Sequence, residues 1–316
     1  MSLNQFYKAI GISKQAVHKN LDHYCKGKDE QMQVLKLIYS IREDHPSMGM
    51  RDLYFKIQPE SMGRDAFESF CKSKNLWSKK PKNYRRTTDS SGVIRFDNLL
   101  QTMTINSIDQ AWQSDITYYE INSTFYYITF IIDSYSRRIV GHNTSKRLNT
   151  EQTTLPALQM ALKTRKNKNM EGLVFHSDGG GQYYSKAFLG ITSKQKMRNS
   201  MCEYAWENGK AERVNGTIKN NYLTHRKIEN FEDLVKEVDR SVLLYNSEKP
   251  HIALNRKSPS TYEKELLYLN QQTKPRMTES FDANNQVYGA SSPLKSEQTK
   301  PQNRDVFYAN NLELSS

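Results

Sequence analysis

Cysteine is scarce in this chain of 316 residues, and long apolar runs are missing. The three cysteines lie far apart and are odd in number, so they predict neither a disulfide framework nor a CxxC zinc site. The longest apolar stretch, Tyr126 to Ile132, has the length of one strand, and the first residues lack the apolar centre of a signal peptide. These absences favour a protein of a reducing cytoplasm over a secreted or membrane-spanning one.

Acidic residues are also in short supply relative to basic ones. The chain has 46 Lys and Arg against 34 Asp and Glu, which gives a formal net charge of +12. A balance this basic indicates a polyanionic partner such as a nucleic acid, although a merely soluble basic surface is the alternative. The length suits two domains with extensions.

One stretch combines groups that suit metal and phosphate binding. The segment from Ala205 to Tyr222, AWENGKAERVNGTIKNNY, begins with a turn-prone Glu-Asn-Gly and continues as a predicted helix. Within that helix Glu212, Asn215 and Lys219 follow at i, i+3 and i+7, so they share one face. A carboxylate, an amide and an ammonium in a row are unusual for a helix that packs in a core.

Two upstream segments supply further carboxylates. Asp115 lies in WQSDITYY and Asp178 in FHSDGGGQYY, each at or just past a short apolar or aromatic run that is typical of a strand. Three carboxylates from two strands and a helix are what a two-metal phosphoryl-transfer site requires. Because the ligands are hard oxygens, two Mg²⁺ or Mn²⁺ ions are favoured over zinc. A chance triple of acids is the alternative, and only the sequence around each acid argues against it.

Five motifs in order carry a resemblance to a known family. Together they cover about half of the chain, from Ser107 to Tyr262, and read AWQSDITYY, FYYITFIIDSYSRRIVGH, FHSDGGGQYYSKAF, ENGKAERVNGTIKNNYL and YNSEKPHIALNRKSPSTY. The chain resembles the DDE-type transposases of bacterial insertion sequences (OrfB type), which share the catalytic core of retroviral integrases. The resemblance implies an α/β fold with a ribonuclease-H-like core, preceded by small all-α helix-turn-helix domains.

The resemblance also implies an activity and its partners. Asp115, Asp178 and Glu212 would be the catalytic acids and metal ligands, and Asn215 and Lys219 would contact the DNA end. The enzyme would cut the element ends and join their 3′-hydroxyls to target DNA. Implied partners are the terminal inverted repeats, the target DNA, further copies of the chain on paired ends, and a companion protein from an overlapping frame. The expected location is the bacterial cytoplasm, at the nucleoid.

The identity of the third acid leaves one alternative open. Since 212 − 178 = 34, the second and third acids are separated by 33 residues, slightly fewer than is usual in the family. A surface loop tolerates such a shortening at small cost, and it falls around Glu203 to Trp206. Glu207 is the rival for the role of Glu212, which we prefer because AERVNGTIK fits the family motif.

The region before the core predicts two helical domains and a linker. Residues 1–28 are interpreted as a helix-turn-helix whose second helix exposes Lys14, Gln15, His18 and Lys19 to a major groove, with an ordinary helical hairpin as the alternative. His18, His23 and Cys25 lack the further ligands that structural zinc needs. Residues 29–76 predict a second helical DNA-binding domain. Residues 77–104 predict a basic linker along the DNA backbone, through Lys79, Lys80, Lys82, Arg85 and Arg86.

The core is assigned to residues 105–266, and residues 267–316 are predicted to be a polar, disordered tail. Paired strands are expected at 112–119 and 125–132, joined near Asn122 and Ser123, with Asp133 as a turn former and not a ligand. The further elements expected in the core are a strand at 138–142, a helix at 150–164, a strand at 173–176, a helix from 184, an edge strand at 197–201 and a helix at 231–245.

Two other functions fit the same sequence. A non-catalytic DNA-binding repressor of the element would need the basic surfaces but not the acids. A nuclease of related fold would cut DNA without joining it, so a strand-transfer product separates it from a transposase.

Overall fold

The computed structural model describes residues 2–78, 96–166 and 168–272 of the chain. Most of the predicted tail lies outside these ranges, and so do the predicted linker cations Lys79, Lys80, Lys82, Arg85 and Arg86. Within them, no helix is both long and apolar enough to cross a membrane.

The predicted hairpin is confirmed and forms the middle of a five-stranded sheet. Strands β1 (Ala111–Ile121) and β2 (Thr124–Asp133) pair antiparallel along their whole length. The two residues between them, Asn122 and Ser123, have φ of 49° and 62°, as a tight turn that matches the strand twist requires. Strand β3 (Ile139–Ser145) continues the sheet beyond β2.

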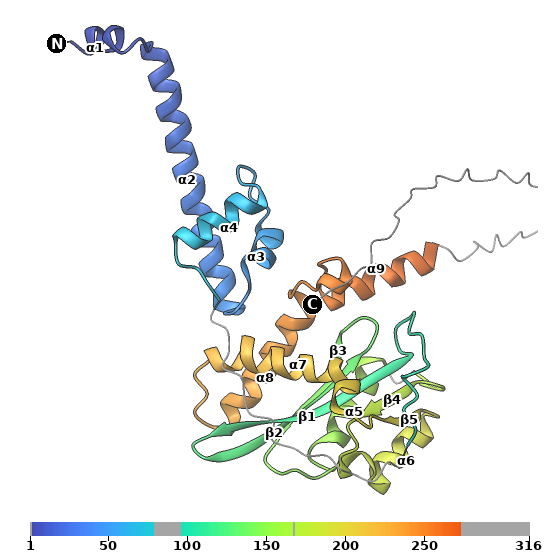
Figure 1. Ribbon diagram of the computed structural model, residues 1–316. Coiled ribbons are helices and arrows are strands. Elements are labelled where there is room, and N and C mark those ends of the chain that lie inside the picture. Colours follow the sequence, from blue (N-terminus) through green and yellow to red (C-terminus); the bar gives the residue numbers. More distant parts are fainter. Residues whose placement is uncertain (1, 79–95, 167, 273–316) are drawn as a thin grey trace, which may run out of the picture. The chain divides into compact units, whose positions relative to one another are not determined.

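Two parallel strands complete the sheet on the other side of β1. Strand β4 (Val174–Ser177) pairs parallel with β1, and β5 (Arg198–Met201) pairs parallel with β4. The strand order is β3-β2-β1-β4-β5, as Figure 1 shows. Helix α5 (Thr154–Thr164) crosses between β3 and β4, and α6 (Lys186–Lys194) between β4 and β5. This arrangement confirms the predicted ribonuclease-H-like α/β core.

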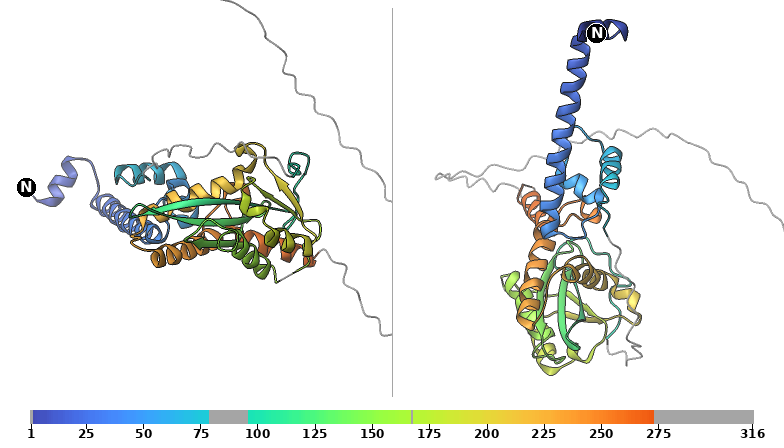
Figure 2. Two further views of the ribbon diagram at one scale, coloured as in Figure 1. Left: turned by 90° about the horizontal axis from the view of Figure 1, so that it is seen from below. Right: turned by 90° about the vertical axis from the view of Figure 1, so that its left-hand side faces the viewer.

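Helices cover both faces of the sheet (Figure 2). Helices α7 (Gly209–Asn221) and α8 (Phe231–Ser247) share one hydrophobic cluster with Ile128, Phe130 and Ile132 of β2. Ile131 points the other way, into the cluster formed with α5 and α6. A central strand that is buried on both faces was expected from its almost continuous apolar sequence.

The first part of the chain is all-α, as predicted. Its helices are α1 (Leu3–Ala9), α2 (Lys14–Asp44), α3 (Met50–Ile57) and α4 (Arg64–Ser73). The last half of α2 packs with α3 and α4 around Ile38, Leu53 and Phe67, which are fully buried.

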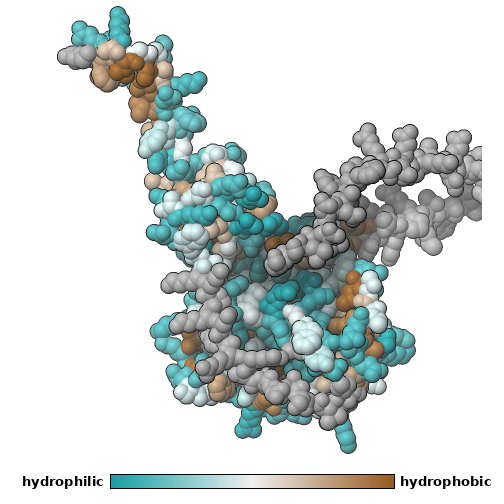
Figure 3. Space-filling view, in the orientation of Figure 1, coloured by the Kyte–Doolittle hydropathy of each residue, from teal (hydrophilic) through white to brown (hydrophobic). Residues whose placement is uncertain are grey.

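The compact helix-turn-helix predicted for residues 1–28 is not observed. Ser13 is the N-cap of α2, since its Oγ accepts the N–H of Ala16 at 3.1 Å. However, α2 runs unbroken through the predicted boundary at residue 28, because no proline interrupts it and a single Gly27 costs a helix only about 1 kcal/mol. Apolar side chains that a packed unit would bury are exposed, for example Phe6 (49%) and Leu21 (52%). Figure 3 shows this apolar surface at the N-terminal end.

Short helical turns and one further helix complete the described chain. Helix α9 (Pro259–Gln272) was not predicted, and it begins with a proline, whose fixed φ suits the first helical position. It continues past residue 267, where the tail was expected to start. The 3₁₀ turns are η1 (Gly181–Tyr183), η2 (Ala205–Asn208), η3 (Leu223–His225) and η4 (Ile252–Leu254).

Candidate active site

Two of the predicted acids lie where neighbouring parallel strands separate. The pairing of β1 with β4 ends at Gln113 and His176. Asp115 follows two residues later, still paired to β2, and Asp178 comes directly after the end of β4. Strands that part in this way leave a crevice at their carboxyl ends, which is where open α/β sheets place their sites.

The third predicted acid approaches from a helix. Glu212 lies in the first turn of α7, which packs on β1 and β2 through Val214 and Ile218. These apolar anchors fix which face of α7 is turned toward the sheet. The three acids therefore come from β1, from the segment after β4 and from α7, as the sequence predicted, with Asp115 half-buried and both Asp178 and Glu212 exposed.

The acids act on one another electrostatically. Burial and the negative charges of Asp178 and Glu212 raise the pKa of Asp115 from 3.8 to about 7. The carboxylate of Asp178 accepts the N–H of Gly180 at 3.1 Å, while the surrounding protein atoms raise its pKa by partial desolvation. A carboxylate whose charged form is disfavoured by burial and by two neighbouring carboxylates is suited to sharing a cation with them.

The acids are not yet arranged as a closed metal site. Among the residues that the structure describes, no group of three His, Cys, Asp or Glu side chains is placed to hold a metal ion. At Asp115, Oδ2 accepts a hydrogen bond of 2.7 Å from Nδ2 of Asn215, and Oδ1 accepts the N–H of Ile116 at 2.9 Å. The donor set of hard oxygens fits Mg²⁺ or Mn²⁺, and each of these oxygens keeps a second lone pair for a cation.

Asn215 and Lys219 lie on the same face of α7 and both reach β1. Lys219 Nζ donates to Thr117 Oγ1 at 3.3 Å and lies 4.7 Å from the centre of the Tyr118 ring. Desolvation lowers the pKa of this ammonium. Asn215 is buried, and its Oδ1 has no hydrogen-bond partner among the described residues. The predicted shared face is thus present, and it meets the strand that carries Asp115.

Sequence reasoning missed a second amide that joins α7 to β1. Asn208, the N-cap of α7, is buried and donates from Nδ2 to the carbonyl oxygen of Ser114 at 2.9 Å. Ser114 also donates its hydroxyl to the carbonyl of Phe130 at 2.9 Å, and its Oγ lies 2.8 Å from the Tyr183 hydroxyl. The residue before Asp115 is therefore held by its side chain and its backbone. In the sequence, Asn208 before Gly209 indicated only a turn.

Glu207, the alternative third acid, makes different contacts. Its Oε2 accepts the backbone N–H groups of Glu203 (2.7 Å) and Tyr204 (3.1 Å), and its Oε1 accepts Nε2 of Gln101 at 2.8 Å. These hydrogen bonds outweigh desolvation and lower its pKa. Glu207 thus closes the loop before α7, a role that occupies both of its carboxylate oxygens.

Asp133 is a structural residue, as predicted. Its Oδ1 accepts the N–H groups of Tyr135 (3.0 Å) and Ser136 (2.7 Å), which forms the turn after β2. A buried ionic network that was not predicted surrounds this turn. Its centre is Glu263 of α9, which binds Arg165 through two hydrogen bonds of 2.7 and 2.8 Å.

The four residues predicted to read a major groove share one surface of α2. Lys14, Gln15, His18 and Lys19 line a shallow hollow there, together with Asp22, His23 and Lys26. Their common face agrees with the prediction, although the helix is not part of a packed helix-turn-helix.

Comparisons with known proteins agree with the motifs. Residues 106–205 match the family model "Integrase core domain", and residues 195–259 match a second model of that description. The "Insertion element IS600 uncharacterized 31 kDa protein" of Shigella sonnei is 26% identical over 264 residues, 81% of this chain and 96% of the relative. "Transposase InsF for insertion sequence IS3A" of Escherichia coli (strain K12) is 34% identical over 122 residues, 38% of this chain and 40% of the relative.

Solved structures with similar folds include two viral proteins. The HTLV-2 integrase catalytic core domain in complex with magnesium is 19% identical, covers 49% of this chain and 95% of its own, and has a TM-score of 0.40. The simian T-cell lymphotropic virus intasome in complex with PP2A regulatory subunit B56 gamma gives 15% identity, 77% coverage of each chain and a TM-score of 0.41. The assignment of the core rests on the two family models and on the strand order of the sheet. The chain is a relative of insertion-sequence transposases and has a core like that of retroviral integrases.

Proposed function

We propose that this relative of the insertion-sequence transposases is itself a DNA transposase, which cuts the ends of its element and joins their 3′-hydroxyls to DNA. The observation that carries the proposal is the arrangement of three acids at the separating ends of β1 and β4. Burial, together with the charges of Asp178 and Glu212, raises the pKa of Asp115 to about 7, so the site is suited to cations. The basic net charge of +12 supplies the general attraction to DNA.

Asp115, Asp178 and Glu212 are the proposed ligands of two Mg²⁺ or Mn²⁺ ions. When bound, such ions activate the attacking hydroxyl and neutralise the charge on the leaving 3′ oxygen. The chain itself contributes the placement of the ligands. Asp178 and Glu212 are exposed, whereas Asp115 is half-buried and accepts a hydrogen bond from Asn215.

Asn215 and Lys219 are the proposed contacts to the DNA end. Nδ2 of Asn215 carries two hydrogens, so it could keep its hydrogen bond to Asp115 and donate the second hydrogen to a phosphate or base. Lys219 lies one helical turn further along α7. A partly desolvated ammonium next to the acids suits a phosphate that lies across both.

The remaining parts of the chain are assigned to DNA recognition. Lys14, Gln15, His18 and Lys19 are proposed to read the terminal inverted repeats, and the cations between residues 79 and 86 to follow the backbone. We further propose that copies of the chain assemble on paired ends, with or without a companion protein from an overlapping frame. The work would take place on nucleoid DNA in the bacterial cytoplasm.

The test uses a labelled duplex that carries the inverted repeat read from the DNA flanking the gene. Wild-type protein should nick and join this end only when Mg²⁺ is present, and Glu212→Gln should do neither while still binding the duplex. Glu207→Gln is the matched control, because it removes the same charge from the loop just before α7. Loss of activity in Glu207→Gln with full activity in Glu212→Gln would move the third acid to Glu207.

Two other results would replace the proposal. Tight and specific binding without cleavage by the wild type, in Mg²⁺ and in Mn²⁺ and with any companion protein added, identifies a repressor. Cleavage without any joined product identifies a nuclease.

A further inference from the structure

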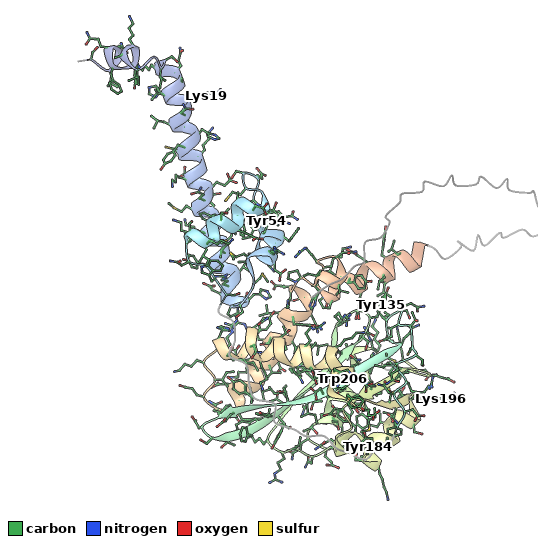
Figure 4. The ribbon with its side chains drawn as sticks, viewed as in Figure 1. Lys19, Tyr54, Tyr135, Tyr184, Lys196 and Trp206 are labelled. Atoms are coloured by element: carbon green, nitrogen blue, oxygen red, sulfur yellow. The ribbon has the colours of Figure 1, made fainter. Side chains whose placement is uncertain are left out.

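Three cations meet where the first turn of α7 approaches the turn between β2 and β3. Lys210 and Arg213 lie on α7, and Arg137 lies in the turn. Lys210 Nζ donates to the carbonyl oxygen of Ser134 at 3.2 Å, which ties the helix to this turn. Figure 4 labels Tyr135, a residue of the same turn. Arg213 is exposed and the other two cations are half-buried, so none of the three is enclosed by the described chain.

The positive charges of these residues are not neutralised by neighbouring acids. Among the residues that the structure describes, none of the three forms an ion pair with a carboxylate, and the nearby Asp133 pairs with Arg165 instead. Burial and the charge of Arg137 lower the pKa of Lys210 to about 8, and the attraction of Asp133 is weaker than this repulsion. Burial also lowers the pKa of Arg137, with a contribution from the charge of Arg213. Partly desolvated cations that repel one another are stabilised when an anion binds between them.

The two helical cations lie on the flank of α7 that is turned away from the proposed third acid. Lys210 and Arg213 are three residues apart and therefore share one flank of the helix. Glu212, Asn215 and Lys219 share the other flank, because at about 100° per residue the two sets lie about 160° apart. The residues of α7 that face the sheet between them are Ala211, Val214 and Ile218. The helix therefore carries two polar surfaces, one on each side of its apolar contact with the sheet.

The chemistry of the second surface indicates what it binds. Ammonium and guanidinium groups carry hydrogen-bond donors and no acceptor, which suits phosphate oxygens. Contacts made only to phosphates hold DNA without reading its sequence. Joining requires two DNA molecules at the acids at the same time, and the surface with Asn215 and Lys219 is already proposed for the element end. The second surface is therefore suited to the second DNA.

We propose that Arg137, Lys210 and Arg213 form a phosphate clamp for the backbone of the target DNA. The inference rests on the proposed function, since only a joining reaction brings a second DNA to the acids. With the end on one flank of α7 and the target on the other, the 3′-hydroxyl of the end is brought to a phosphodiester of the target. The phosphate clamp tolerates any target sequence, because it contacts no base.

The first test measures binding of a fluorescent duplex of random sequence. The full-length protein is first saturated with unlabelled element ends, and Ca²⁺ replaces Mg²⁺ so that binding is measured without cleavage. Arg213→Gln and Lys210→Gln should each weaken binding of the random duplex about tenfold, as expected for one hydrogen bond to a charged group. Each should also lower the slope of log affinity against log salt by about one. The affinity for the element end, measured separately, should not change.

Two matched variants show whether the lost charge is the cause. Arg213→Lys keeps the charge and should keep most of the affinity for the random duplex. Lys196→Gln removes an exposed charge that is already paired with Glu171 at 3.0 Å, so it should change the binding of neither DNA. Thermal melts followed by circular dichroism check that Arg213→Gln and Lys210→Gln are folded.

The second test measures joining with ends that already carry a free 3′-hydroxyl, in Mg²⁺ and at increasing concentrations of target plasmid. For Arg213→Gln and Lys210→Gln, the target concentration that gives half-maximal joining should rise about tenfold, and the maximal rate should stay close to that of the wild type. Cleavage of uncut ends by the same preparations should be unchanged. A residue that only supports the acids would instead lower both rates at every target concentration.

The outcomes separate this inference from the proposed function. If the wild type cuts and joins while the variants bind the random duplex as tightly as it does, the phosphate clamp is wrong and the transposase stands. If the wild type does not cut but the variants lose affinity for the random duplex alone, the phosphate clamp stands without the activity. If the variants lose affinity for the element end to the same extent, the cations contact the end and the proposal fails.

Discussion

Replacing Asp115 with asparagine should stabilise the metal-free protein, although the change removes a proposed catalytic acid. The pKa of Asp115 is raised from 3.8 to about 7, first by burial and then by the charges of Asp178 and Glu212. Since one pKa unit corresponds to about 1.4 kcal/mol, the ionised Asp115 costs the fold about 4 kcal/mol at most. Asparagine avoids this cost and keeps an oxygen that accepts the hydrogen bond from Asn215, while the N–H of Ile116, which Asp115 Oδ1 accepts at 2.9 Å, loses its acceptor and offsets part of the gain.

The direction in which the folding stability changes with pH follows from the same two pKa values of Asp115, 3.8 and about 7. Between pH 4 and pH 7 the folded chain holds the Asp115 proton while the unfolded chain has lost it, so the folded state binds more protons. The stability of the wild type must therefore fall as the pH rises through this window. The advantage of Asp115→Asn should grow by roughly 2–3 kcal/mol between pH 5 and pH 8.

The assay is urea unfolding of both proteins at pH 5, 6, 7 and 8 in EDTA, followed by circular dichroism. Asp22→Asn is the control, because Asp22 is an exposed acid on α2 and its removal should leave the pH profile unchanged. Added Mg²⁺ should restore stability to the wild type and not to Asp115→Asn, because a ligand stabilises only the state that binds it. Equal stabilities of wild type and Asp115→Asn at every pH would refute the reasoning, and would mean that the three acids do not share one electrostatic site.

Two further predictions concern the fold. Gly141→Ala should destabilise the chain severely in a thermal melt, because the added Cβ would collide with the carbonyl oxygen of Ala157. Gly190→Ala in α6 is the control: its added Cβ would contact no other atom, so the change should be neutral or slightly stabilising in the same melt. Glu263→Gln should cost about 1–3 kcal/mol, since it removes one charged partner of the buried Arg165, which keeps Asp109 at 2.7 Å and Asp133 at 3.8 Å. Arg165 contributes to lowering the pKa of Glu263 to about 2, so the wild type should lose this stability as the pH falls from 4.5 toward 2; a variant that kept the same acid sensitivity would contradict the assignment.

Short-range patterns were sufficient to predict much of the fold. The apolar run of β2 and the turn residues before it define the hairpin within about 20 residues, and strand pairing of this kind depends on local sequence. The positions of Asp115 and Asp178 just after their apolar runs also placed both acids at strand ends. The sequence could not show that β1 and β4 separate after Gln113, since that depends on the register between strands that lie far apart in the chain.

The predictions failed where the structure depends on contacts between residues that are far apart in the chain. Residues 1–28 were interpreted as a packed helix-turn-helix, but helical sequence alone does not say whether a partner exists to cover the apolar side chains of these helices. Contacts over long separations were equally inaccessible. Asn215 binds Asp115 across 100 positions and Glu263 binds Arg165 across 98, and neither pair has a periodic signature.

The geometry of the acids is set by neutral amides. Apolar packing of α7 on the sheet is non-directional and would allow the helix to slide or turn. Asn208 and Asn215 remove that freedom, because one donates to the carbonyl of Ser114 and the other to the carboxylate of Asp115. Glu212 lies between these two asparagines in the chain, so both hydrogen bonds hold its helix beside the strand of Asp115 against the repulsion between the two carboxylates.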